Sequence, residues 1–364
     1  MSGDERRRER AGDEGPFGFD RKKAIVTAVV AVALVSGAIA LVGQIANFDA
    51  VLKAARAADK RWLPLCAFGQ LLGYCGYVLA YRDVARACGG PRLPLGAVAR
   101  VVGIGFGAFA LGSTPGGLAL DFWALHRAGA PTHESARRVL GLNTLEWGLL
   151  SFFAMLSALA VLSGRGEGAP LVMTLSWIVA VPLALAAAVW VSAPGRVERL
   201  TKLPRGRGGS LREGPRTWVA TKGRAAFADA VGGVAIVRHL VRHPFRYPGA
   251  LGGCAVYWIG QVLTLWSAVQ AFAGGPLVPA ALILAFATGY AASALPLPAG
   301  GAGGIDAALA FSMQAVGVPL AAALLAAVVY RIFTFWLPIV PALGLLPSIK
   351  RLNEELPRAE RETA

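Results

Sequence analysis

Long apolar runs alternate with charged segments along most of the chain. A helix of about 20 apolar residues can cross a hydrocarbon core about 30 Å thick, and it satisfies its own backbone hydrogen bonds. The pattern therefore predicts an all-α polytopic membrane protein with six transmembrane helices. These predicted spans cover residues 24–46, 62–81, 140–162, 171–192, 249–272 and 320–346.

Two further apolar stretches, residues 95–114 and 278–297, end in clusters of proline and glycine. A short apolar helical segment follows each cluster. This arrangement favours re-entrant helical hairpins at residues 95–128 and 278–315, which enter the membrane and return to the same side. The alternative is that ordinary spans are kinked, because membrane helices carry glycine and proline freely.

The distribution of positive charge favours the hairpins. Lys and Arg near the ends of spans stay on the cytoplasmic side of a membrane. Eight full spans would place residues 193–247, with twelve Lys and Arg, outside. With two re-entrant hairpins, thirty basic residues lie inside and only five outside. We therefore predict a multi-pass plasma-membrane protein with cytoplasmic N- and C-termini.

The chain also contains an internal repeat. Residues 113–131 and 297–319 each run through a proline, paired glycines, an aspartate, a short apolar segment and a Gly-x-Pro motif. The glycines of the two motifs, Gly129 and Gly317, are 188 residues apart, as are the prolines, Pro131 and Pro319. In the predicted topology the two halves cross the membrane in opposite orientations. They would therefore form an inverted repeat, an architecture common in alternating-access transporters.

This reading divides the chain into four parts. Residues 1–23 are predicted to be a disordered basic cytoplasmic tail, and residues 347–364 a second cytoplasmic tail. The first membrane repeat covers residues 24–163. The second covers residues 164–346 and includes a basic cytoplasmic loop, residues 193–247.

Composition supports the membrane class and limits the chemistry. Hydrophobic residues make up 55% of the chain and charged residues 16%, with a mean hydropathy of +0.55, which excludes an ordinary soluble protein. Four scattered cysteines show no disulfide or zinc-knuckle spacing. His239 and His243 have metal-ligand spacing but no third ligand in the sequence. We predict no metal and no cofactor.

Four ionisable residues lie at predicted membrane depth: Asp121, Glu146, Asp306 and Arg331. Each costs about 2.5 to 3.5 kcal/mol at a span centre, so such residues usually face a cavity or a partner. Asp121 and Asp306 are predicted to fall in the first turns of helices, where they either cap the helix or bind a coupling ion or an amine.

The glycine clusters and Arg331 suggest an anionic ligand. Backbone amides at the start of a helix can receive an anionic headgroup, and an arginine can bind phosphate through two N–H groups. Alternatively, Arg331 pairs with Asp306 and only locks two helices together. The predicted substrate-binding residues are Pro115, Gly116, Gly117, Asp121, Glu146, Pro298, Gly300, Gly301, Gly303, Gly304, Asp306, Tyr330 and Arg331.

The basic loop points to the membrane surface as a partner. It contains a Gly/Arg stretch that should be flexible and then an amphipathic portion, which we expect to lie on the anionic cytoplasmic leaflet. Few aromatic residues are present for stacking on bases, so the loop does not favour nucleic acid as a partner.

The two break regions and the last span carry a family resemblance. The motifs are STPGG with a following acid, LPLPAGGAGG with Asp306, and VVYRIFTFWLPIVPALGLL. They resemble the lysylphosphatidylglycerol synthase transmembrane region, a flippase-like family, most specifically at Tyr330-Arg331 and at residues 336–338. Family members commonly have glutamate where this chain has Asp306.

The resemblance implies a bilayer cavity that moves a lipid headgroup between leaflets. Members with a C-terminal aminoacyl-transferring domain also make the lipid, but this chain is expected to lack that synthase activity. We predict a non-enzymatic, flippase-like transporter for a lipid with an anionic or polyprenyl-linked headgroup. The alternative is an accessory membrane subunit that presents a lipid carrier to a separate glycosyl- or acyltransferase. The sequence leaves open a homo-oligomer or a partner transferase.

Overall fold

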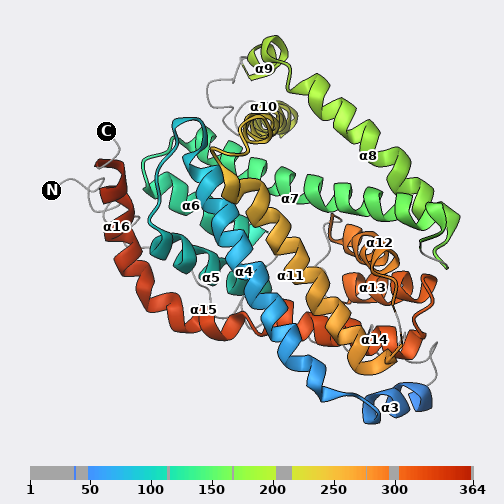
Figure 1. Ribbon diagram of the computed structural model, residues 1–364. Coiled ribbons are helices and arrows are strands. Elements are labelled where there is room, and N and C mark those ends of the chain that lie inside the picture. Colours follow the sequence, from blue (N-terminus) through green and yellow to red (C-terminus); the bar gives the residue numbers. More distant parts are fainter. Residues whose placement is uncertain are drawn as a thin grey trace.

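The structure is a computed structural model that describes residues 37, 48–112, 115–165, 168–201, 215–275, 277–294 and 303–361. Throughout these residues the regular elements are helices, without strands, so the all-α prediction is confirmed (Figure 1). The main helices are α3 (Phe48–Arg56), α4 (Leu63–Arg86), α5 (Leu95–Gly112), α6 (Pro115–Arg127), α7 (Thr132–Ala160), α8 (Leu171–Val191), α9 (Pro194–Thr201), α10 (Pro215–Arg242), α11 (Pro248–Ala273), α12 (Pro279–Tyr290), α13 (Gly304–Ala315), α14 (Leu320–Arg331), α15 (Ile339–Leu345) and α16 (Ile349–Arg361).

Four helical segments of the described chain are long and apolar enough to cross a membrane: Lys60–Gly89, Thr132–Gly164, Leu171–Val191 and Leu320–Leu356. They coincide with four of the six predicted spans. The first predicted span, residues 24–46, lies outside the described residues except for Gly37. The remaining one, residues 249–272, forms helix α11.

Helix α11 is not among the four apolar segments, although it is 26 residues long. At 1.5 Å per residue this helix is about 39 Å long, which is enough to span a membrane. Its apolar character is diluted by polar residues that are buried in the bundle, such as Gln261, Thr264 and Ser267. Neighbouring helices, rather than lipid, surround these side chains.

Helices α4 and α11 form the most extensive helix pair (Figure 1). Glycines allow this close approach. A Cβ atom at Gly76 would lie 2.5 Å from the amide nitrogen of Tyr257, and one at Gly260 would lie 2.5 Å from the carbonyl oxygen of Gly69. Small residues at helix contacts are typical of membrane bundles, where tight packing replaces the hydrophobic effect. The α4–α11 pair is the central support of the fold.

Two pairs of short helices stand where the hairpins were predicted. Helix α5 packs against α6, and α12 packs against α13. The apolar segments Leu95–Ala108 and Pro279–Ala294 are shorter than the four long ones. Figure 1 shows each pair running side by side next to the α4–α11 pair. The first break separates α5 from α6, whereas the second falls in residues 295–302, outside the described residues.

The Gly-x-Pro motifs have the same local structure in both halves. Gly129 and Gly317 have φ angles of 87° and 93°, a left-handed conformation that glycine adopts without steric cost. Pro131 and Pro319, two residues later, are the N-cap residues of α7 and α14. Positions 188 residues apart therefore make equivalent turns, as the repeat in the sequence predicts.

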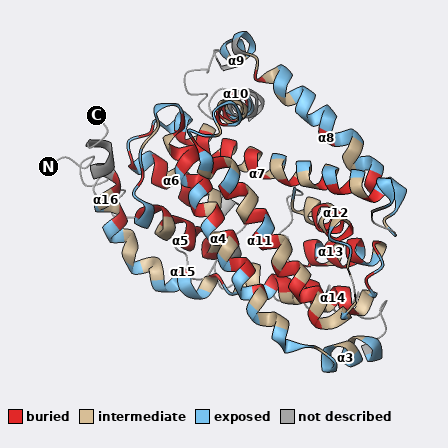
Figure 2. Cartoon of the chain, viewed as in Figure 1, coloured by how far each residue is buried: buried red, intermediate tan, exposed pale blue. Residues whose placement is uncertain are grey.

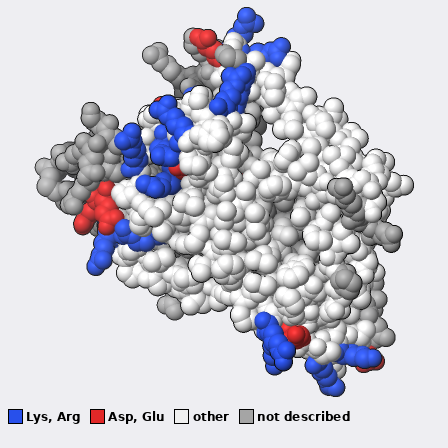
Figure 3. Space-filling model, in the orientation of Figure 1, with Lys and Arg blue, Asp and Glu red and all other residues white. Residues whose placement is uncertain are grey.

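Charged and apolar surfaces are separated in the way a membrane requires. Lys and Arg gather at two ends of the molecule, and a broad uncharged band lies between them (Figure 3). Helix α8 contributes largely exposed side chains to this band, among them Val172, Leu183 and Val189 (Figure 2). A continuous apolar surface of this size is typical of contact with lipid.

The predicted basic loop contains two helices, α9 and α10. Helix α10 packs along α7, where the Oδ1 atom of Asp229 lies 3.4 Å from Arg137 Nε and its Oδ2 lies 3.3 Å from His133 Nδ1. One face of the amphipathic portion is therefore buried against protein. The Gly/Arg stretch, residues 202–214, lies outside the described residues.

The C-terminal segment, predicted as a tail, forms helix α16. Leu352 and Leu356, four residues apart on one helix face, are completely buried. Arg100 of α5 holds Glu355 at 2.6 Å. The short apolar stripe and this ion pair dock α16 onto α5 and α6.

Candidate functional site

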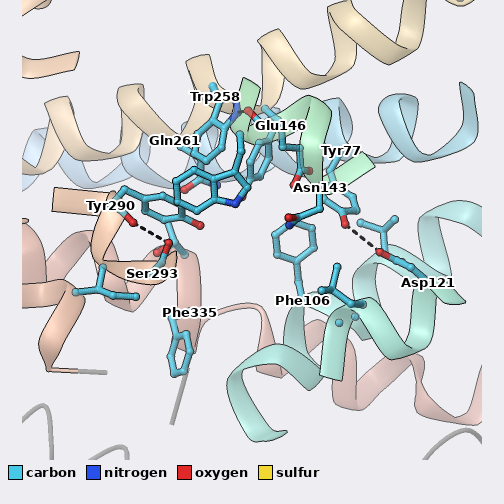
Figure 4. A pocket seen from close by; sticks show the side chains of 18 of the residues that line it. Tyr77, Phe106, Asp121, Asn143, Glu146, Trp258, Gln261, Tyr290, Ser293 and Phe335 are labelled. Carbon is cyan, nitrogen blue, oxygen red and sulfur yellow. Dashed lines mark hydrogen bonds between the residues drawn. The ribbon is translucent and has the colours of Figure 1, made fainter. Parts of the chain in front are cut away.

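A cavity of about 180 Å³ lies beside the α4–α11 pair and is walled by both short helix pairs, α7 and α14 (Figure 4). We call it the central cavity. Its walls combine aromatic rings with polar groups from both halves of the chain. The polar lining residues are Tyr77, Asp121, Asn143, Glu146, Tyr257, Gln261, Tyr290, Ser293, Tyr330, Arg331 and Thr334.

Asp121 lies on the wall formed by α6 and is 3% exposed. The hydroxyl of Tyr77 donates a hydrogen bond of 2.9 Å to its Oδ2 atom (Figure 4). The hydroxyl of Tyr81 donates one of 2.8 Å to the carbonyl oxygen of Asp121. The prediction that Asp121 lies in a first helical turn is wrong. Helix α6 already begins at Pro115, so the glycines belong to the helix and Asp121 follows almost two turns later.

Glu146 lies on α7 and is 8% exposed. Among the residues that the structure describes, no group hydrogen-bonds to its Oε1 atom. Its carbonyl oxygen accepts a hydrogen bond of 2.8 Å from the indole N–H of Trp258. A buried carboxylate oxygen without a partner is costly, so this position favours a role that uses the carboxylate.

Asp306 and Arg331 form a buried ion pair. The Nε atom of Arg331 lies 2.8 Å from Oδ1 of Asp306, and their side chains are 7% and 4% exposed. The other carboxylate oxygen of Asp306 accepts a hydrogen bond of 2.8 Å from the N–H of Gly303, whose φ is 82°. Asp306 is therefore both a helix cap and an ion-pair partner, the two alternatives weighed against a substrate role.

A chain of hydrogen bonds connects three helices next to the cavity. The hydroxyl of Tyr330 donates a hydrogen bond of 2.7 Å to Oε1 of Gln261, and Nε2 of Gln261 lies 3.4 Å from Oε1 of Gln70. Residues from α14, α11 and α4 are thereby joined. This arrangement fixes the amide of Gln261, a lining residue that the sequence did not single out.

The structure brings part of the predicted site together. Five of its residues line the cavity: Gly117, Asp121, Glu146, Tyr330 and Arg331. Asp306 pairs with Arg331, and Gly303 and Gly304 form the start of α13. Pro115 and Gly116 are the first residues of α6. Pro298, Gly300 and Gly301 lie outside the described residues.

Aromatic residues are the main component that sequence reasoning missed. Tyr77 and Tyr257 lie with ring centroids 5.7 Å apart, and Trp258 and Tyr290 lie 5.3 Å apart. Phe106 lies 5.3 Å from Tyr77. Tyrosine and glutamine within apolar runs were a usable signal, but only the tertiary structure shows that they face one cavity.

Asn143 occupies the place that the repeat assigns to it. It is 188 residues before Arg331 in the sequence, and both residues line the central cavity from equivalent helices, α7 and α14. One half of the cavity therefore offers an amide where the other half offers a guanidinium. At these two positions of the cavity the charge therefore differs.

No group of three His, Cys, Asp or Glu side chains with metal-binding geometry occurs in the described part of the chain. The rings of His239, on α10, and His243, just after it, are tilted against each other with their centroids 4.5 Å apart. The chemistry visible at the central cavity is hydrogen bonding, ion pairing and aromatic contact.

Comparison with known families assigns the chain to one of them. The family model of the lysylphosphatidylglycerol synthase transmembrane region matches residues 28–342, which include every described residue that lines the central cavity. A comparison with curated proteins gives no match. The family and the four apolar helices agree on a membrane protein, and the family indicates a lipid-related function. The chain belongs to the family of the lysylphosphatidylglycerol synthase transmembrane region.

Proposed function

We propose that this protein moves the polar headgroup of a lipid or amphiphile between the two leaflets through the central cavity, without covalent chemistry. The observation that carries the proposal is the buried Glu146 carboxylate, which lines a polar cavity within an apolar bundle. Removing a carboxylate from water costs several kcal/mol unless a partner compensates. A passing headgroup would provide that partner.

The walls of the cavity suit an amphiphile. Polar groups can bind a headgroup, while the surrounding rings of Phe106, Trp147 and Tyr257 contact its apolar part. Because Asp306 already holds the Nε of Arg331, the cavity is suited to a headgroup that offers hydrogen-bond donors or positive charge to Glu146. Hydroxyls of a polyprenyl-linked sugar would meet this requirement better than an anionic group alone.

The repeated architecture supports movement as well as binding. Broken helices from two related halves meet at the cavity, and exchange of conformation between such halves alternates the open side. We propose that α5–α6 and α12–α13 are re-entrant hairpins of an inverted repeat, and that they act as the moving gates. The equivalent turns at Gly129 and Gly317 support the relationship between the two halves.

The test is leaflet-resolved lipid translocation in proteoliposomes with several labelled headgroups. We expect the wild-type protein to move a subset of headgroups and Glu146→Gln to lose most of this movement. Glu354→Gln is the matched control, because Glu354 is an exposed glutamate on α16, away from the cavity. Both variants should be monodisperse and retain helical circular dichroism.

Two outcomes separate the proposed function from its alternative. Lipid translocation by the Glu146→Gln variant at the wild-type rate would show that the Glu146 carboxylate has no part in the mechanism. Absence of movement for every headgroup, with well-folded wild-type protein, would overturn the transporter. The accessory subunit would then be favoured, and lipid binding without movement would be its expected behaviour.

A further inference from the structure

A second hollow, of about 480 Å³, lies at one charged end of the bundle. We call it the basic pocket. Its walls come from the end of α4, the segment before α5, the turn between α6 and α7, and the start of α11. It shares no lining residue with the central cavity. It is therefore a separate feature of the molecule.

Positive charge dominates the basic pocket. Arg86, Arg92 and Arg246 line it, and Glu134 is its acidic lining residue. That carboxylate is held by Nη1 of the buried Arg138 at 2.9 Å, so a further positive charge lies directly behind it. The lining as a whole attracts an anion.

Two of the arginines converge on one ring. The guanidinium carbons of Arg86 and Arg246 lie 5.5 and 5.8 Å from the ring centroid of Tyr247. Arg86 also donates a hydrogen bond of 3.2 Å to the carbonyl oxygen of Arg246 and lies 2.8 Å from Asp83. These contacts place both guanidinium groups around one aromatic ring at the rim of the pocket, where their positive charges favour a bound anion.

Arg86 has donor capacity that the described chain does not use. Its Nε atom is buried, and no acceptor for it occurs among the residues that the structure describes. A buried unsatisfied donor of a charged group is costly, so negative charge near the exposed part of this guanidinium is favourable.

Two helices also begin at the basic pocket. Pro131 and Tyr247, which line it, are the N-cap residues of α7 and α11, and neither caps its helix with its own side chain. The start of a helix carries partial positive charge and presents backbone N–H groups. On α11, Asp83 uses the N–H of Gly249, at 2.7 Å. The partial positive charge at the start of α7 adds to the positive charge of the arginines.

We propose that the basic pocket binds a phosphate group. Arginine pairs bind phosphate oxygens through parallel hydrogen bonds, and helix starts favour the same anion. Basic residues such as Arg86, Arg92 and Arg246, when they lie near the ends of membrane helices, are suited to the phosphates of lipid headgroups. The phosphate group belongs either to a membrane phospholipid or to a soluble phosphate compound. This proposal is independent of transport through the central cavity.

The test measures binding with two probes. Inorganic phosphate is titrated into purified protein in detergent, and retained phosphatidylglycerol is compared with phosphatidylcholine by native mass spectrometry. The variants are Arg92→Gln, Arg246→Gln and their combination, because both side chains are exposed and their loss should leave the fold intact. Arg224→Gln, an exposed arginine on α10 outside the pocket, is the matched control.

We expect each pocket substitution to weaken binding about tenfold, the usual effect of one charge-assisted hydrogen bond. Binding of inorganic phosphate that is lost in the variants would identify a soluble ligand. Selective retention of phosphatidylglycerol, lost in the same variants, would identify a lipid phosphate. Equal binding by the wild type and the double variant, or equal weakening by Arg224→Gln, would overturn the proposal. Failure here would leave lipid translocation by the central cavity unaffected.

Discussion

The guanidinium of Arg331 is held by the carboxylate of Asp306 at 2.8 Å, and both side chains are buried in the helical bundle. The pair joins α13 to α14 in the second half of the chain. At the equivalent place in the first half, Asn143 replaces the arginine, and Asp121 is held by the hydroxyl of Tyr77. The two halves therefore stabilise their acidic residues by different means.

Neutralising one partner of the ion pair should destabilise the protein strongly. In Asp306→Asn the Arg331 charge stays buried without its counter-ion, which typically costs about 3 to 5 kcal/mol. The double variant Asp306→Asn with Arg331→Gln should lose less than the two single variants together. Thermal unfolding in detergent measures this. A melting temperature of Asp306→Asn equal to that of the wild type would contradict the prediction.

Removing the Tyr77 hydroxyl should act on the Asp121 carboxylate. Tyr77→Phe keeps the ring contacts with Phe106 and Tyr257 but removes one hydrogen bond, at a cost of about 1 to 3 kcal/mol. Tyr81→Phe is the control, because it removes a bond to the carbonyl oxygen of Asp121 and leaves the carboxylate contact. We expect similar losses of stability but a larger loss of lipid translocation in Tyr77→Phe. Equal translocation rates would show that the carboxylate does not need this donor.

A methyl group between α4 and α11 should destabilise the bundle. In Gly76→Ala the new Cβ atom would lie 2.5 Å from the backbone nitrogen of Tyr257, so the helices must separate, at a cost of about 1 to 3 kcal/mol. Gly252→Ala on α11 is the control, because no atom lies within 4 Å of its Cβ position. Melting temperatures of the two variants compare the effects. A lower melting temperature for the control would contradict this account.

His239 on α10 should titrate below the ordinary range of histidine. Burial, and then the positive charges of His243 and Arg246, lower its pKa. Arg246→Gln removes one of these charges, so the pKa of His239 should rise, whereas Arg224→Gln should leave it unchanged. Phosphate bound in the basic pocket should also raise it. An NMR titration of the imidazole signals measures all three effects.

The lowered pKa of His239 also predicts how the stability of the folded protein depends on pH. The folded protein binds the proton of His239 less tightly than the unfolded chain does. The free energy of unfolding therefore decreases as pH falls below the ordinary pKa of histidine. Replacing His239 by Asn should reduce this acid sensitivity. Melting curves at neutral and mildly acidic pH provide the comparison, and identical pH dependence in both proteins would contradict the assignment.

The sequence by itself determined the class of this protein and much of its local structure. Apolar runs long enough for a bilayer predicted four spans that the structure also has, because burial of the backbone in lipid permits only continuous helices. The repeated Gly-x-Pro motifs marked two positions, Gly129 and Gly317, that make equivalent turns, since a glycine's left-handed φ depends on local residues. The family was also visible in short motifs around Asp306 and Arg331.

Only the tertiary structure decided which distant residues meet. Tyr77 and Asp121 are separated by 44 residues, and Gln261 and Tyr330 by 69. No periodicity encodes such contacts, because they depend on how closely α4 approaches α11 and on where the short helices stop. For the same reason the sequence placed Asp121 at a helix cap, missed the aromatic walls of the central cavity, and treated the docked helix α16 as a tail. Local residue chemistry fixes elements, whereas the packing of those elements fixes the site.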